Sequence, residues 1–145
     1  MHIRLAQLKD ASNLKTLNDL FNGDNCNSLN KIVLSLEQNT FEIVAVAEQD
    51  DELIGFCCGQ MFCSFCYGVY YGEITELFVL EEFRKRGVGR GLMTFMERQL
   101  TQKGAVNLQL FTGKENTTAQ SFYKSLGYIK SDEQLFRKRG DRDES

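Results

Sequence analysis

A strand-like run, a basic glycine-rich segment and an amphipathic helix follow one another between residues 73 and 100. The segment Arg84–Gly91 holds three glycines and four basic residues. Glycine lets backbone N–H groups approach a ligand closely, and the free N–H groups at a helix start favour an anion. Arginine and lysine add charge-assisted hydrogen bonds to phosphate oxygens. The sequence therefore predicts a strand–turn–helix unit that binds a phosphorylated cofactor.

The spacing of the glycines excludes two well-known phosphate loops. No Lys-Ser or Lys-Thr pair follows a glycine here, as the P-loop requires. After Gly87 and Gly89 the third glycine, Gly91, comes one residue too early for the Gly-x-Gly-x-x-Gly pattern. A dinucleotide site also has an acidic residue in a second strand, about twenty residues after the glycines, and this sequence has no such residue there.

The pattern Arg84-x-x-Gly87-x-Gly89 instead resembles the acyl-CoA pyrophosphate loop of the GCN5-related N-acetyltransferase (GNAT) superfamily. Residues 116–128 are similar to that family's Asn-x-x-Ala-x-x-Phe-Tyr-x-x-x-Gly-Phe/Tyr stretch, which follows at the usual distance. Each motif alone is moderately specific, whereas the two in this order are strong evidence. The resemblance is close over residues 73–128 and holds elsewhere by pattern only.

The hydrophobic pattern predicts the element order β-α-α-β-β-β-α-β-α-β. Strands are expected over residues 2–6, 41–48, 73–80 and 106–112, with another from residue 53 on and a last one at 128–129 and 135–138. We expect Asn27 or Ser28 to cap the second helix, and Gly104 to end the helix that follows the glycine-rich segment. The resemblance implies an α/β fold (an α+β mixed sheet) that is mostly antiparallel, with splayed strands four and five and helices on both faces. We expect a single domain over residues 1–138 and a flexible tail over 139–145.

Composition narrows the partners. The net charge is −3, and the Gly/Arg segment occurs once, which argues against nucleic acid as a partner. Neither a signal peptide nor a run of membrane-spanning length is visible, so we expect a cytoplasmic protein with no membrane association, as a monomer or homodimer. Five cysteines without a secretory cue do not suggest a disulfide framework.

The pair Cys63 and Cys66 has the spacing of a redox pair or half of a zinc site. A structural zinc needs four ligands, and the adjacent Cys57 and Cys58 do not supply a second pair of that spacing. The single histidine, His2, is far away in sequence. We therefore predict buried or incidental thiols and no metal site.

The resemblance implies acetyl-CoA as the cofactor. It implies that the backbone amides of residues 86–91 and the nearby arginines bind the pyrophosphate. It also implies that three amides of the fourth strand bind the pantetheine arm, and that Leu77 N–H donates to the thioester carbonyl. Lys85 stands where many relatives have glycine. The expected cofactor-binding residues are Leu77, Phe78, Val79, Arg84, Lys85, Arg86, Gly87, Val88, Gly89, Arg90, Gly91, Asn116 and Phe122.

Three residues are candidates for proton transfer. Glu73 matches the strand-four glutamate that serves as base in one branch of the family, and Glu76 matches an acidic position in the branch that acetylates aminoglycosides. Of the two, we expect Glu73 to be the base. Strand alternation places the two on opposite faces unless the strand bends between them. Tyr123 is where the family places the acid that protonates the leaving thiolate. Without the resemblance, both glutamates would be read as a solvated strand face and Tyr123 as part of the core.

These residues predict an acetyl-CoA-dependent N-acetyltransferase that transfers the acetyl group directly to a primary amine of a small molecule or peptide. The aromatic stretch over residues 62–71 should shape the acceptor side. An acidic balance suits a cationic acceptor, such as an aminoglycoside or a polyamine, and comes from Glu37, Glu42, Glu73 and Glu76. The alternative is a non-catalytic acyl-CoA-binding regulator on the same fold, which needs neither Glu73 nor Tyr123. A nucleotide-binding module is a third reading.

Overall fold

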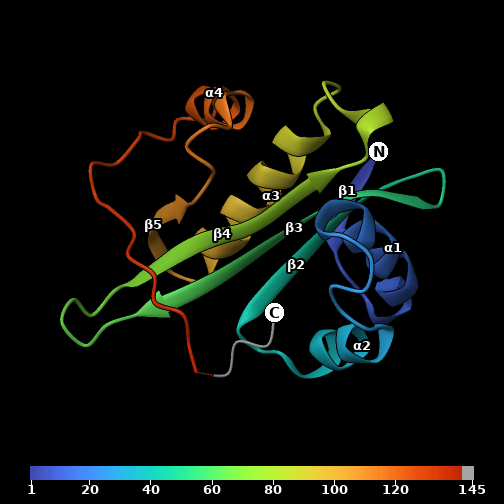
Figure 1. Cartoon of the computed structure of the whole chain (residues 1–145), viewed down its shortest axis with the longest axis horizontal. Coiled ribbons are helices and arrows are strands. Elements are labelled where there is room, and N and C mark those ends of the chain that lie inside the picture. Colours follow the sequence, from blue (N-terminus) through green and yellow to red (C-terminus); the bar gives the residue numbers. More distant parts are fainter. Residues whose placement is uncertain (142–145) are drawn as a thin grey trace. The chain divides into compact units, whose positions relative to one another are not determined.

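The structure is a computed structural model that describes residues 1–141. One sheet has the strand order β1-β2-β3-β4-β5, in which only the β4–β5 pair is parallel. The strands are β1 (His2–Leu5), β2 (Glu42–Gln49), β3 (Glu52–Cys63), β4 (Tyr70–Val79) and β5 (Ala105–Leu110). The helices are α1 (Ala11–Asn22), α2 (Leu29–Gln38), α3 (Val88–Gln102) and α4 (Thr117–Ser125), with short 3₁₀ turns η1 (Leu8–Asp10) and η2 (Glu81–Phe83). The predicted mixed, mostly antiparallel sheet is confirmed (Figure 1).

The chain divides into two compact units, Met1–Phe111 and the residues from Thr112 on. The first unit contains the whole sheet, α1, α2 and α3. The second contains α4 and the extended segment that follows it. The prediction of a single domain over residues 1–138 stays a prediction.

Helices cover both faces of the sheet within the first unit (Figure 1). On one face, α1 packs on a cluster that includes Val46, Phe56 and Phe78. On the other face, the apolar stripe of α3 is fully buried and lies against small residues of the central strands: a Cβ at Gly59 would come within 2.7 Å of the Met96 sulfur. The glycines of β3 and β4 therefore let α3 pack closely on the sheet.

Local chemistry explains several helix ends. Ser28 accepts a hydrogen bond from Lys31 N–H at 3.1 Å and caps α2, as predicted. Gly104, with φ of 109°, follows the end of α3 and supplies the expected stop. Asp10 precedes α1 without making a side-chain cap bond, because its carboxylate pairs with Arg4 instead.

The prediction of a last strand is wrong. Residues 128–141 contain neither a helix nor a strand. Ile129 and Phe136 are about nine-tenths exposed, so the apolar residues behind the prediction do not contribute to a core. An apolar run forms a strand only where a partner strand accepts its hydrogen bonds. Residues 142–145 of the predicted flexible tail lie outside the described residues.

Candidate active site

The turn before α3 has the backbone that the glycine pattern predicts. Gly87 caps the helix in the left-handed region, with φ of 86°, and a Cβ there would meet no atom within 4 Å. Lys85 also has a positive φ, 62°. Two left-handed residues within three positions turn the chain sharply, so that the first amides of α3 open the helix just after the arginines.

The third glycine has another role. Gly91 N–H donates to Gly87 O at 2.9 Å and closes the first turn of α3. This amide is therefore used within the helix and does not point toward a ligand. A Cβ at Gly91 would come within 2.6 Å of Ile3 Cδ1, so the glycine permits close packing of α3 on β1. The amides that start α3 and have no i−4 partner within it are those of Val88, Gly89 and Arg90. The predicted donor segment 86–91 is thus one residue too long.

The loop arginines are partly held by aromatic rings. Arg84 Nε donates to Val79 O at 2.8 Å, and its guanidinium lies 5.7 Å from the centroid of the Phe78 ring. Arg86 lies at the same distance over the Phe83 ring. Through these contacts Arg84 joins the loop to the end of β4. The contacts therefore help to fix the residue at which α3 begins.

The edge of β4 that faces β5 is only half paired. Pairing with β5 runs from Tyr70 to Ile74, and β4 continues to Val79. Leu80 N–H donates to Ile54 O on β3, and Val79 O accepts Arg84 from the other side. Because successive residues of a strand alternate in direction, the amides of Leu77 and Val79 face the half-open edge.

The amide of Phe78 faces β3, so only two of the three predicted strand amides reach that edge. Its ring is buried beside Phe56 and Phe21, at centroid distances of 5.9 and 5.1 Å. The structure assigns Phe78 to the core that holds β4 in place.

A β-bulge puts both candidate glutamates on one face. Cys58 pairs with Glu76 while the next residue, Gly59, pairs with Ile74, so Thr75 is an extra residue on β4. Gly59 faces α3, and so does its partner Ile74, which leaves Glu73 on the α1/α2 face. Glu76 lies on that same face, opposite Cys58. Simple alternation would place the two glutamates on opposite faces, but the bulge inserts one residue and so brings about the exception of a strand that bends between them.

Glu76 lies in a hollow of about 200 Å³ between the sheet and the α1–α2 pair. Burial raises the pKa of its carboxyl. Glu42 enters the same hollow from β2, and its pKa is raised by burial and by the charge of Glu76, while a hydrogen bond with Cys58 acts in the opposite direction. The other lining residues are Leu14, Asn18, Asn27, Ile32, Ser35, Leu36, Val44 and Phe56.

Glu73 lies outside this hollow. Gln109 on β5 donates from Nε2 to Glu73 Oε1 at 2.8 Å, across the parallel pair. Sequence reasoning counted Glu42 only toward a general acidic balance. Its place in the hollow follows from the β2–β3 register, which the chain's own pattern does not show.

The second unit carries the remaining predicted residues. Asn116 Oδ1 accepts a hydrogen bond from Ala119 N–H at 3.1 Å and caps α4. The Tyr123 ring lies 5.3 Å from Phe122 and 6.1 Å from Tyr128, measured between centroids. These contacts fix the Tyr123 ring within its own unit.

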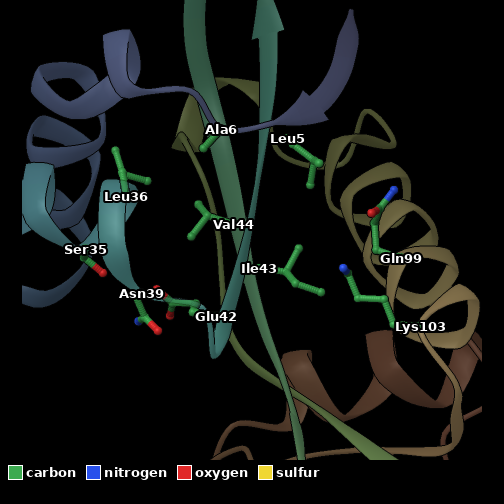
Figure 2. Close-up of a pocket in the computed structure, with 10 residues that line it drawn as sticks. All are labelled: Leu5, Ala6, Ser35, Leu36, Asn39, Glu42, Ile43, Val44, Gln99 and Lys103. Atoms are coloured by element: carbon green, nitrogen blue, oxygen red, sulfur yellow. The ribbon is translucent and has the colours of Figure 1, made fainter.

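A further hollow lies at the β2 edge, beyond the end of β1 (Figure 2). Leu36 of α2 and Asn39, just after it, line the hollow on one side, and Gln99 of α3 and Lys103, just after it, line the other. None of the predicted site residues lines this hollow.

Residues 1–141 contain neither a metal-binding cluster nor a membrane-spanning helix. Within that range, no group of three or more histidine, cysteine or acidic side chains could hold a metal ion. No described helix has both the length and the apolar character needed to cross a membrane.

Comparison with known proteins identifies the family. The sequence model described as "Acetyltransferase (GNAT) family" matches residues 11–128. The chain belongs to the acetyltransferase (GNAT) family. An uncharacterized N-acetyltransferase of Chlorobaculum tepidum is 30% identical over 134 residues, which are 92% of this chain and 79% of the relative. The aminoglycoside N(6')-acetyltransferase type 1 of Salmonella typhimurium is 32% identical over 94 residues, 63% of this chain and 65% of that protein.

Solved structures agree on the fold of this GNAT chain. AAC(6')-Iy, in complex with a bisubstrate analogue, matches with a TM-score of 0.83 and 23% identity, over 96% of this chain and 97% of that one. A ribosomal-protein-alanine N-acetyltransferase of Brucella melitensis matches with a TM-score of 0.82 and 17% identity, over 97% and 100%. The predictions of a GNAT fold and of an N-acetyltransferase enzyme are confirmed.

Proposed function

We propose that this GNAT chain transfers the acetyl group of acetyl-CoA directly to a primary amine, and that the acceptor is a cationic small molecule. The observation that carries the proposal is the half-open edge of β4, which leads to the left-handed turn and the first amides of α3. Val88, Gly89 and Arg90 would hold the pyrophosphate, and Leu77 and Val79 the pantetheine arm. Solved neighbours in complex with CoA or a CoA analogue support this reading.

When bound, acetyl-CoA supplies the acetyl thioester. We propose Glu76 as the base that takes a proton from the acceptor's ammonium, since its raised pKa makes it a better base than an ordinary carboxylate. Leu77 N–H would donate to the carbonyl oxygen as its charge develops. One C–N bond forms and one C–S bond breaks, and Tyr123 would give its proton to the leaving thiolate. The acetylated nitrogen then loses its second proton, which would restore the Tyr123 phenol.

Glu73, which the resemblance indicates as base, is the competing candidate. Its hydrogen bond to Gln109 and its place outside the hollow favour a binding role. The non-catalytic alternative requires neither a base nor an acid.

The test is acceptor-dependent thiol release from acetyl-CoA against aminoglycosides, polyamines, peptides and small amines. We expect Glu76→Gln to lower kcat about 100-fold or more, Glu73→Gln to act mainly on KM, and Glu52→Gln, an exposed control, to change nothing. The wild-type kcat should fall as the pH drops below the raised pKa of Glu76, because protonation removes the base. CoA binding without thiol release in the presence of any of the amines would favour the non-catalytic regulator. A large loss of kcat in Glu73→Gln, with none in Glu76→Gln, would identify Glu73 as the base.

A further inference from the structure

The outer half of the β3–β4 hairpin carries an aromatic cluster on the α1/α2 face. Phe62 and Tyr71 are cross-strand partners whose rings stack at 5.9 Å and 25°. Tyr67 meets the Tyr71 ring edge-on, at 6.3 Å and 88°. Phe62 and Tyr67 are 45% and 69% exposed. We call Phe62, Tyr67 and Tyr71 the hairpin cluster; contiguous apolar side chains that reach the surface are candidates for a binding surface.

A carboxylate lies directly beside these rings. Glu73 is two residues from Tyr71 on the same face of β4, and both pair with β5. Gln109 holds one Glu73 oxygen at 2.8 Å and so orients the carboxylate. The faces of aromatic rings and a carboxylate both attract a cation, and together they select a positively charged group over a neutral one.

The hairpin cluster and the hollow that contains Glu76 lie on the same face of the same two strands, β3 and β4. The strand partners of Glu73 and Glu76 are Gln60 and Cys58, two residues apart on β3. The two carboxylates therefore leave the sheet about 7 Å apart on one face. About four or five methylene groups span this distance, with single bonds near 1.5 Å.

We infer that the acceptor is a linear diamine or polyamine: one ammonium reacts at Glu76, and a second, non-reacting ammonium binds Glu73 and the hairpin cluster. The inference rests on the proposed function and names its substrate class. It assigns Tyr71 and Phe62 to specificity and gives them no part in the chemistry.

The test compares kcat/KM for α,ω-diamines of increasing length with that for monoamines of equal length. We expect an optimum at four or five methylene groups and a preference of about tenfold over the monoamine. Tyr71→Leu should abolish the preference by raising KM for the diamine alone, and Tyr71→Phe, which keeps the ring, should retain it. Tyr70→Leu is the control, because Tyr70 is the neighbouring tyrosine of β4, is half-exposed and faces α3.

Calorimetric binding of the same amines separates the two proposals. Tyr71-dependent binding of the diamine without acetyl transfer would support the ammonium site at Glu73 and the hairpin cluster, and would contradict both the proposed transfer and the role of the diamine as acceptor. Acetyl transfer with equal kcat/KM for diamines and monoamines would overturn the inference and leave the enzyme intact. The same result would follow if Tyr70→Leu and Tyr71→Leu had equal effects on the preference, or if only an aminoglycoside were acetylated.

Discussion

At the scale of single residues, the two adjacent cysteines of β3 show how position controls reactivity. Cys57 faces α3 and Cys58 faces the α1/α2 side, and both are buried. Burial raises the pKa of Cys57 to about 12 and that of Cys58 well above its usual value. A thiol that stays protonated at neutral pH is a poor nucleophile, which supports direct transfer over an acyl-enzyme.

Alkylation of the thiols should therefore divide the five cysteines. In the folded protein at pH 8, we expect Cys26, Cys63 and Cys66, which are exposed, to react with iodoacetamide. Cys57 and Cys58 should react roughly a thousandfold more slowly, because so little thiolate is present. Peptide mass spectrometry reads the outcome, and unfolding in urea should make all five react. Rapid acetylation of Cys57 during turnover would contradict direct transfer.

At the scale of elements, the turn before α3 contains a strained residue. Lys85 has φ of 62°, a conformation that costs a residue with a Cβ about 1 kcal/mol or more. Lys85→Gly should therefore raise the free energy of unfolding by up to about 1 kcal/mol, measured by urea denaturation. Lys85→Ala keeps the Cβ and removes the charge, so it should leave stability near the wild-type value. Equal gains from both variants would mean that repulsion among the basic residues, and not strain, is relieved.

At the scale of the whole molecule, a buried ion pair joins β1, η1 and β2. Arg4 Nη1 and Nη2 donate to the Asp10 carboxylate at 2.8 and 3.0 Å, and Nη2 also reaches Glu48 at 3.3 Å. Asp10 is 3% exposed and also accepts Gln7 N–H at 2.7 Å. The hydrogen bond with Arg4 lowers the pKa of Asp10, which is therefore charged in the folded protein at neutral pH.

Acid should release this stabilisation. A lowered folded pKa means that the contribution is complete above the unfolded value, near 3.9, and is lost as the pH falls through the folded value. Asp10→Asn should cost about 3 kcal/mol at pH 7 and flatten the fall of the stability profile below about pH 4. Urea denaturation over this pH range measures both effects; an unchanged profile would assign the acid sensitivity to other carboxylates. Lys15→Gln, which breaks the partly exposed pair with Asp19, should cost less than about 1 kcal/mol.

Short-range patterns determined most of what the sequence could predict. The loop Arg84–Gly89, the Ser28 cap and the stop at Gly104 depend on residues a few positions apart, and the structure has the expected turn, cap and stop. The glycine spacing, together with the second motif over residues 116–128, was enough to indicate the GNAT family. Glycine preference and capping are local, so a single chain segment carries the information.

Tertiary structure alone decided the rest, because it depends on which strands pair and in what register. The bulge at Thr75 moved Glu73 and Glu76 to one face, and the β2–β3 register brought Glu42 to the same hollow as Glu76. The apolar residues at 128–138 had a strand's composition but pair with no strand of the described chain. Register and pairing are set by contacts between distant segments, and these contacts, more than local pattern, decide which carboxylate can meet an acceptor amine.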